Sequence, residues 1–310
     1  MRPALDGAAG AGSRPPLLLR YWGVRGSVPA PGPDTARYGG NTPCVELRAA
    51  DGRRLVFDAG TGLRAFGDAL ATADAPAGEV AVLVTHGHAD HVHGLPFFAP
   101  MAHGRAALAV YAAADAVEGV RGAVRALLQP PLFPEADGLV GRVPVRPLAA
   151  DGAETPVAGF AVRAVPLAHP GGAFGFVVRD PASGARVAYL SDNELAAIEG
   201  ACGGRRALLE AIADVDVLLH DATYLPAELG ARRGWGHSSY AEAVRLASDA
   251  GVGRLVLFHH DPARGDEAMD RLARVAQALG AASRPAVAVE AAREGETLAV
   301  EARVGAVGSA

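Results

Sequence analysis

The sequence predicts an α/β protein in which strands and helices pack in layers, and three observations lead to this fold class. About half of the 310 residues are hydrophobic, which is enough to bury a large core. Short apolar runs bounded by turn residues recur through the chain and are typical of strands. The chain begins strand-rich and then alternates strands with helical patterns, as an α/β layered fold does.

The expected elements follow from the length and spacing of these apolar runs. The expected strands are residues 17–23, 44–50, 53–60, 79–86, 107–113, 160–169, 174–180, 186–192, 216–222, 254–260 and 286–291. The expected helices are residues 115–128, 205–213, 238–250 and 266–280. The Pro/Gly-rich stretch 129–159 reads as a loop with one or two strands. We therefore expect one domain over residues 17–302, with a disordered leader at 1–16 and a loose tail at 303–310.

Composition narrows the classes of function. The formal net charge is −5 and the chain has no dense basic run, which argues against a nucleic-acid-binding surface. All 29 cationic side chains are arginine, so a Schiff-base lysine and a Walker lysine are excluded. Cys44 and Cys202 stand far apart without metal-site spacing, as in a reducing compartment. Without a long apolar segment, we expect a soluble cytoplasmic protein with no membrane association.

Histidines concentrate in one short stretch, VAVLVTHGHADHVHG, at residues 80–94. An apolar run ends there, and His86, His88, Asp90, His91 and His93 follow within eight residues. Other polar residues also sit at the ends of expected strands, where open sheets place their ligand sites. These are His169, Asp192, His220, Asp221 and His259.

Imidazole and carboxylate side chains together suit zinc or a similar divalent ion. Within HGHADH a tight loop could aim two histidines at one ion, and the aspartate and third histidine at a neighbouring ion. A helix is disfavoured because the preceding run is strand-like. The alternative is a solvated polar loop whose histidines occur by chance.

The motif HGHADH resembles the HxHxDH motif of the metallo-β-lactamase superfamily. Further similar motifs follow in the same order along the chain: FDAGTG at 57–62 comes before the loop, and PLAHP, YLSDN and LFHHDP come after it. The resemblance covers residues 17 to about 302. It implies a four-layer αββα sandwich with a metal site at one edge of the two sheets, in which Asp58 would orient the ligand loop.

The resemblance also implies the metal ligands. One ion would take His86, His88 and His169, the other Asp90, His91 and His259, and Asp192 would bridge them. Two divalent ions, expected to be Zn²⁺ although Mn²⁺ and Fe²⁺ tolerate the same ligands, would hold a hydroxide for hydrolysis. Asp90 therefore counts as both a ligand and a catalytic residue. His93 and His103 are not carried over as ligands.

A second pair of motifs, HDATY at 220–224 and GWGHSS at 234–239, resembles the ribonuclease Z and phosphodiesterase branch. The resemblance implies that Asp221 and His237 form an acid pair near the leaving group. Phosphodiester cleavage expels a poor alkoxide leaving group, so a protonated His237 has a role as general acid. The alternative for His237 is a structural residue before a helix that Ser238 or Ser239 caps.

The favoured function is a dinuclear metal-dependent phosphodiesterase acting on a small phosphodiester, with cyclic ones included. Ribonuclease Z proteins that mature transfer RNA commonly carry a protruding RNA-gripping arm, whereas residues 170–191 here predict a simple hairpin. A transfer RNA 3′-processing endoribonuclease is one alternative, and a thioesterase, lactonase or glyoxalase-like hydrolase is another. A noncatalytic metal-binding or nucleic-acid-binding module is the third. Dimers are common among the relatives, so a homodimer is possible.

Several details stay open at this point. Arg25, Arg37 and Asn41 could lie beside the metals and contact a phosphate, or serve only the solvation and turns of their loop. Ala89 stands where the subgroup usually has a bulky residue. Asp221 replaces the common glutamate and shortens the reach to His237 by one methylene. No role is predicted for His220 or His260.

Overall fold

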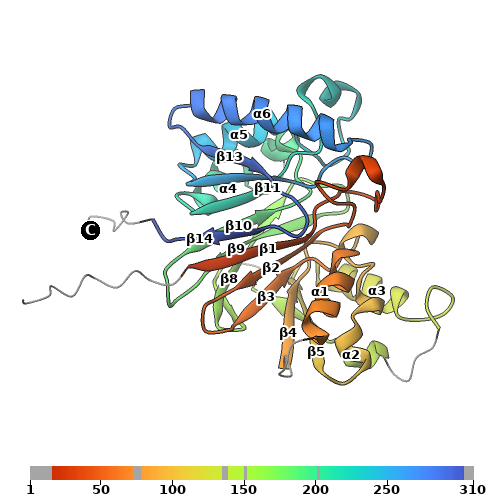
Figure 1. The fold of residues 1–310 in the computed structure, drawn as a ribbon. Helices are drawn as coiled ribbons and strands as arrows, with labels where there is room; N and C mark the ends of the chain where they lie inside the picture. Colours follow the sequence, from red (N-terminus) through yellow and green to blue (C-terminus); the bar gives the residue numbers. More distant parts are fainter. Residues whose placement is uncertain (1–15, 73–77, 135–138, 150–151, 201–202, 304–310) are drawn as a thin grey trace, which may run out of the picture.

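The computed structural model describes residues 16–72, 78–134, 139–149, 152–200 and 203–303. Two sheets of seven strands pack face to face, and helices cover their outer faces (Figure 1). This confirms the predicted αββα sandwich. The expected leader and tail lie, apart from Pro16 and Arg303, outside the described residues, so the domain limits stay a prediction.

The first sheet combines an antiparallel and a parallel half. Its strands are, in sheet order, β14 (Thr297–Val300), β1 (Leu17–Gly23), β2 (Cys44–Arg48), β3 (Arg54–Phe57), β4 (Gly78–Leu83), β5 (Ala106–Ala113) and β6 (Val145–Leu148). The pairs from β14 to β3 are antiparallel, and those from β3 to β6 are parallel. The carboxyl ends of β3, β4 and β5 therefore share one edge.

The second sheet repeats this division. Its strands are, in sheet order, β13 (Ala288–Ala291), β12 (Arg254–Phe258), β11 (Val217–Asp221), β10 (Arg186–Leu190), β9 (Ala173–Arg179), β8 (Phe160–Leu167) and β7 (Thr155–Val157). The pairs from β7 to β10 are antiparallel, and those from β10 to β13 are parallel. Here β10, β11 and β12 bring their carboxyl ends to one edge.

Alternating side chains build three apolar cores between the four layers. Along β3, Leu55 and Phe57 enter the core between the sheets, whereas Val56 enters the core under the helices of the first sheet. Along β11, Leu219 faces the same central core and Leu218 faces the helices of the second sheet. Strands buried on both faces read as continuous apolar runs, which is why the sequence shows them so clearly.

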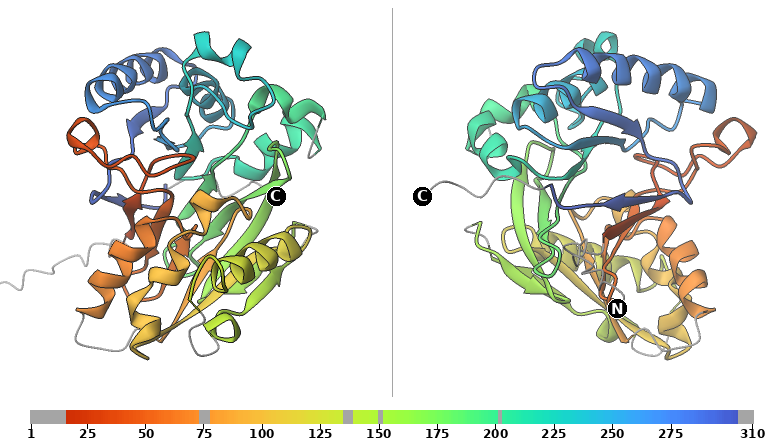
Figure 2. Two further views of the ribbon diagram at one scale, coloured as in Figure 1. Left: turned by 90° about the vertical axis from the view of Figure 1, so that its right-hand side faces the viewer. Right: turned by 60° about the vertical axis from the view of Figure 1, so that its left-hand side comes forward.

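The helices lie on the outer faces of the sheets, as the two further views in Figure 2 also show. They are α1 (Gly62–Ala71), α2 (Ala99–Ala102), α3 (Val117–Leu127), α4 (Gly204–Ile212), α5 (Tyr240–Asp249) and α6 (Asp266–Ala282). The 3-10 turns are η1 (Pro33–Thr35), η2 (Ala89–His91), η3 (Leu95–Phe97), η4 (Leu139–Arg142), η5 (Leu195–Gly200) and η6 (Pro226–Ala231). None of the helices in the described residues has the length and apolar content needed to cross a bilayer.

The predicted elements match the structure apart from three that were missed. Residues 129–159 contain β6 and β7, as expected, and all four predicted helices are present. The sequence interpretation overlooked α1, α2 and β14. Helix α1 carries an apolar stripe at Leu63, Phe66 and Leu70. It begins at Gly62, within the glycine-rich segment FDAGTG, and glycine is typical of turns.

Several strands end in a tight left-handed turn at the edge where the site lies. Asp58 after β3, Asp192 after β10 and His259 after β12 have φ values of 56°, 60° and 59°. A non-glycine residue in this conformation costs about 1–3 kcal/mol and persists only where the surroundings impose it. These turns direct three polar side chains from the strand ends toward the edge where the two sheets meet.

Candidate metal centre

The loop after β4 forms the first half of the site. It leaves the strand at Val84 and closes in the turn η2 (Ala89–His91). Backbone hydrogen bonds fix its shape, since Ala59 N–H donates to the carbonyl of His91 at 2.8 Å and Gly94 N–H donates to that of Ala59 at 2.8 Å. The loop is thereby tied to the end of β3.

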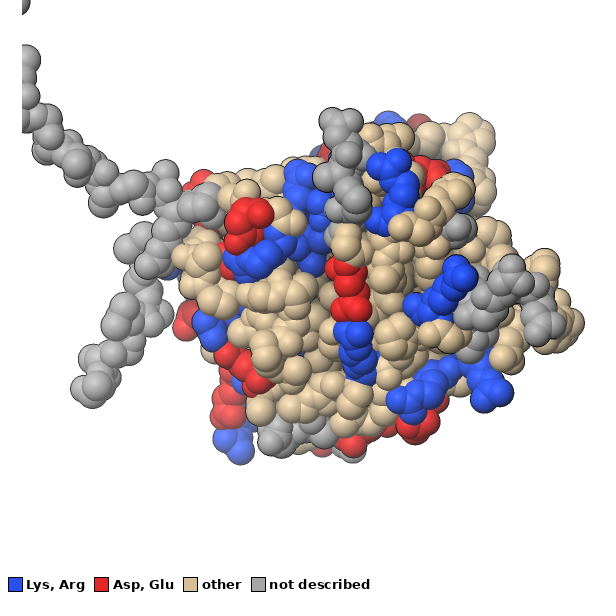
Figure 3. Space-filling view, turned by 90° about the horizontal axis from the view of Figure 1, so that it is seen from below, with Lys and Arg blue, Asp and Glu red and all other residues tan. Residues whose placement is uncertain are grey.

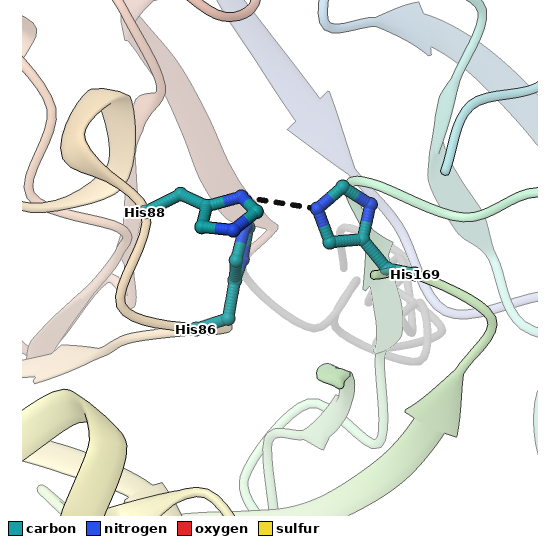
Figure 4. A group of neighbouring side chains, drawn as sticks. All are labelled: His86, His88 and His169. Carbon is teal, nitrogen blue, oxygen red and sulfur yellow. Dashed lines mark hydrogen bonds between the residues drawn. The ribbon is translucent and has the colours of Figure 1, made fainter. Parts of the chain in front are cut away.

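One group of possible ligands consists of His86, His88 and His169 (Figure 4). The imidazoles of His88 and His169 face each other, with Nδ1 of the first 3.1 Å from Nε2 of the second. The carboxylate of Asp192 closes this group, because its Oδ2 lies 3.8 Å from Nε2 of both His86 and His169. Residues from both sheets therefore converge on one point.

The second group consists of Asp90, His91, Asp192 and His259, all of them buried. Oδ1 of Asp192 lies 3.2 Å from Nε2 of His91 and 3.1 Å from Nε2 of His259. Oδ2 of Asp90 lies 3.3 Å from the same two nitrogens. Asp192 thus turns one oxygen toward each group, as the sequence comparison implied for a bridging ligand.

Outer partners hold the ligand rings in place. His91 Nδ1 lies 2.8 Å from Asp58, which also accepts hydrogen bonds from Tyr189 Oη at 2.8 Å and Thr85 N–H at 2.9 Å. On the opposite sheet, His259 Nδ1 lies 3.1 Å from Thr223 Oγ1, and His169 Nδ1 lies 3.1 Å from the carbonyl of Gly236. Such contacts fix the tautomer and direction of metal-binding histidines.

The unsatisfied atoms of the centre fit a pair of divalent ions. Nε2 of His86 and Nε2 of His91 are buried and make no hydrogen bond within the described part of the chain. A buried polar atom without a partner costs about 1–3 kcal/mol, so each such atom calls for an explanation. A bound cation supplies one, and a set of imidazoles and carboxylates is the ligand chemistry of zinc, manganese and iron.

The buried carboxylates of Asp192 and Asp90 also favour a site for cations. Burial alone would raise the pKa of Asp192, but the imidazoles of His259 and His91 hold that pKa well below its usual range. Burial opposes the ionised form of Asp90 too, and the nearby His91 and His259 lower its pKa. Two ionised carboxylates are thus held in a buried site, where cations offset their charge.

The predicted acid pair is in direct contact. Nδ1 of His237 lies 2.6 Å from Oδ2 of Asp221, so the shorter aspartate reaches the ring. Asp221 also accepts the backbone N–H groups of Thr223 at 3.1 Å and Ser238 at 3.2 Å. Burial alone would lower the pKa of His237, but the Asp221 carboxylate raises it to about 9. The His237 ring stacks on His259, with centroids 4.9 Å apart.

A cavity of about 450 Å³ opens onto this centre. Its walls include possible ligands from both groups together with His237 and the loop before it. The lining residues are Ser27, His88, Ala89, Asp90, His169, Pro170, Asp192, Gly234, Trp235 and His237. Possible ligands and His237 therefore line one and the same cavity.

Three residues that the sequence left open between phosphate contact and a role in their loop have partners within the protein, which favours the role in the loop. The Arg25 side chain is fully buried and donates to the carbonyls of Gly39, Asp261 and Arg264. Arg37 pairs with Asp270 at 2.7 Å, and Asn41 donates to Glu294 at 2.6 Å. None of the three is among the residues that line the cavity.

The remaining histidines and Cys44 lie outside the candidate centre. His93 and His103 are exposed, in keeping with their exclusion as ligands. His220 lies 2.7 Å from the carbonyl of Asp221, and His260 lies 2.8 Å from that of Ala292. Cys44 is buried in the first sheet, whereas Cys202 lies outside the described residues.

Three residues that shape the site were missed by the sequence interpretation. Ser27 donates its backbone N–H to Asp90 at 2.8 Å, and Thr223 contacts His259. Glu194 is buried and accepts hydrogen bonds from the loop around residue 235. Thr223 could have been noticed, because it stands two residues after Asp221. Nothing in the local sequence marks the other two.

Comparison with known proteins agrees with this geometry. The family profile described as "Beta-lactamase superfamily domain" matches residues 53–260. Ribonuclease Z of Sulfurisphaera tokodaii is 35% identical over 83 residues, a match that covers 27% of this chain and 25% of that enzyme. This chain is therefore aligned with only about a quarter of that relative's length.

Two solved structures share the fold over nearly the whole chain. The metallo-beta-lactamase fold protein YhfI from Bacillus subtilis superimposes with a TM-score of 0.65 at 19% identity, covering 92% of this chain and all of that one. A diphosphatase of the PhnP family superimposes with a TM-score of 0.62 at 18% identity, covering 93% of this chain and 99% of that one. At these identities the likeness establishes the architecture.

Proposed function

This chain belongs to the metallo-β-lactamase superfamily, and on that premise we propose that it is a dinuclear metal-dependent hydrolase of a small phosphodiester. The observation that carries the proposal is the contact of 2.6 Å between Asp221 and His237 in the same cavity as the ligand cluster. A hydrolase of thioesters has less need of such an acid, because a thiolate departs more readily than an alkoxide.

The proposed ligands are the seven residues grouped above. His86, His88 and His169 would hold one ion, Asp90, His91 and His259 the other, and Asp192 would face both. When bound, such ions activate a water and offset the charge of the phosphate. The residues of the chain orient that site: Asp58 fixes the ring of His91, and the N–H of Ser27 fixes the carboxylate of Asp90.

His237 is the proposed general acid. Its Nδ1 is engaged by Asp221, which leaves Nε2 to donate a proton. The oxygen of a water bonds to phosphorus as that water releases one proton, the bond from phosphorus to the leaving oxygen breaks, and the leaving oxygen takes a proton from His237, which then regains one from solvent. The carboxylate of Asp221 stabilises the protonated ring before transfer and holds it in position.

The structure of the hairpin favours a small substrate. Residues 170–191 contain β9 and β10, which pair antiparallel from Arg179 with Arg186 to Phe176 with Tyr189. This stretch carries no protruding arm that could grip RNA. On the face seen in Figure 3, arginine and acidic side chains are interspersed, a distribution unlike the continuous basic track that follows a nucleic-acid backbone.

A second candidate is ribonuclease activity, favoured by the similarity to ribonuclease Z of S. tokodaii. Metal-loaded protein assayed with bis-p-nitrophenyl phosphate, 2′,3′-cyclic AMP and a transfer RNA precursor separates the candidates. We expect both small diesters to be cleaved and the precursor to be left intact. Cleavage of the precursor at a higher kcat/KM than either small diester would instead favour the ribonuclease.

The role of His237 has its own test. His237→Ala should keep two ions per chain and lose about 10²–10⁴-fold in kcat on the cyclic nucleotide, whose leaving group needs a proton. The loss should be smaller on the nitrophenyl ester, whose leaving group does not. His103→Ala, at an exposed histidine outside the cavity, is the matched control and should behave like the wild type. No diesterase activity with a full metal complement would overturn the proposal.

A further inference from the structure

The two tryptophans of the chain occupy opposite environments. Trp22 is 8% exposed, donates its indole N–H to Glu46 at 3.3 Å and packs edge-on against Phe66. Trp235 is 59% exposed. A large aromatic side chain left in solvent forgoes the free energy of burial, so its position asks for a reason other than packing.

Trp235 lines the cavity of the metal centre. It stands two residues before His237, and the same cavity wall includes His88 and His169. A molecule that places its phosphate at the ligand cluster therefore brings its substituents within reach of the loop that carries the indole. This position separates Trp235 from other exposed apolar side chains, such as Phe97, which lies outside the cavity.

The loop that presents Trp235 is held rigidly. The buried carboxylate of Glu194 accepts the N–H of Gly234 at 2.9 Å and that of Gly236 at 2.9 Å, so it clamps the chain on both sides of the tryptophan. Gly236 has a φ of 85°, and a Cβ there would lie 2.0 Å from Nδ1 of His169. The loop and a proposed ligand are thus in van der Waals contact. A preorganised side chain loses little entropy on binding.

A cation also supports the indole. The guanidinium carbon of Arg232 lies 5.2 Å from the ring centroid of Trp235 and 5.0 Å from that of Tyr224. Arg232 therefore bridges an exposed ring and a buried one, and it holds the indole by a cation–π contact. Aromatic surfaces fixed in this way are the means by which proteins stack heterocycles next to a bound phosphate.

We propose that Trp235 forms a stacking surface for a planar heterocycle carried by the substrate, which makes the preferred substrates nucleoside phosphodiesters. This inference rests on the proposed function and adds to it a residue that determines specificity. The phosphate would lie at the ligand cluster and the base on the indole, within the same cavity.

Binding affinities test the stacking surface without any turnover. On the zinc-loaded protein, calorimetry would compare AMP with ribose 5-phosphate, which lacks the base. Trp235→Ala should weaken AMP binding by roughly 5- to 150-fold and change ribose 5-phosphate binding by less than about twofold. Trp235→Phe should retain most of the affinity because it keeps an aromatic face. Phe97→Ala, at a side chain 57% exposed outside the cavity, should change neither.

Kinetics supply the second readout. With 2′,3′-cyclic AMP, Trp235→Ala should raise KM and leave kcat nearly unchanged, since the contact binds substrate and transition state equally. Equal loss of affinity for AMP and ribose 5-phosphate would overturn the inference. So would a wild-type protein that binds both ligands equally well. If the protein cleaves diesters without preference for a base, the stacking inference is rejected and the proposed hydrolase function stands. If AMP binding depends on Trp235 but no diester is cleaved, the proposed function is rejected and the stacking inference stands.

Discussion

The two sheets supply their proposed ligands differently. The loop 86–91 after a strand of the first sheet carries four of them, whereas the second sheet supplies single ligands from three separate strand ends. His169 follows β8, Asp192 follows β10 and His259 follows β12. The acid pair also belongs to the second sheet, because Asp221 ends β11. The proposed metal ligands thus come from both sheets, while the proposed proton donor and its partner come from one of them.

The outer contacts differ in the same way. At the end of β3 in the first sheet, Asp58 joins Thr85 and His91 of the ligand loop to Tyr189 of the second sheet in one buried network, so the loop is braced as a unit. On the second sheet, Thr223 braces His259 and the Gly236 carbonyl braces His169 separately. We therefore expect a change in the first sheet's network to disturb several ligands, and a change in the second sheet to disturb one.

The largest effect is expected at Asp192, where the two sheets meet. Asp192→Asn replaces a carboxylate that faces His86 and His169 with one oxygen and His91 and His259 with the other. Turnover should fall on the order of 10³-fold or more, and the chain should retain fewer than two ions. Metal analysis and diesterase assays measure both. A variant with two ions and a tenth of normal activity would contradict a shared role.

The next largest effect is expected for Asp221→Asn, which should impair proton donation by His237 and leave metal binding intact. Asp221→Asn removes the charge that raises the pKa of His237 to about 9. A general acid works only while protonated, so activity is lost as pH rises through its pKa. The alkaline limb of kcat should move to lower pH, with kcat at pH 8 falling about 10²-fold and the metal content unchanged. An alkaline limb of kcat at the same pH as in the wild type would show that Asp221 does not set the pKa of the general acid.

Asp58→Asn probes the network that braces the loop of the first sheet. The amide keeps the size of the side chain but loses the charge that faces His91 at 2.8 Å. Metal affinity should fall about 10- to 100-fold, measured by competition with a chelator. Tyr189→Phe removes one hydrogen bond to the same carboxylate and is the matched, milder change. Wild-type affinity in Asp58→Asn would show that the loop needs no such brace.

The smallest effect is expected at Thr223. Thr223→Val keeps the shape of the side chain and removes its contact with His259 at 3.1 Å. Since one ring is affected rather than a network, metal affinity should fall about 10-fold, at the low end for such contacts. A loss in Thr223→Val as large as that in Asp58→Asn would erase the distinction between the two sheets.

Much of the fold was predictable because buried strands reveal themselves as apolar runs. Strand β1 was placed at its observed bounds, and β12 was expected to run two residues beyond Phe258. The missed strand β14 lies at a sheet edge, and most of its residues are not fully buried, so its apolar pattern is weak. Helix α2 has only four residues, which is too short for a helical period to show.

The residues that lie together at the site were predictable where they are close in sequence or share a strand-end position, whereas contacts between distant loops were not. The proposed ligands were recognisable from such positions and from their order. Ser27 and Asp90 are 63 residues apart, and Glu194 and Gly236 are 42 apart. Arg25 looked like a phosphate ligand because arginine commonly is one, yet its guanidinium is used by three backbone carbonyls.

The left-handed turns at Asp58, Asp192 and His259 have a consequence for how this protein evolves. Glycine adopts such a turn without strain, so Asp192→Gly or His259→Gly would relieve about 1–3 kcal/mol of backbone strain while deleting a ligand. Folding alone therefore does not preserve these side chains. A lineage released from selection for catalysis would be expected to lose them early, and to keep the sandwich long after the metal centre had gone.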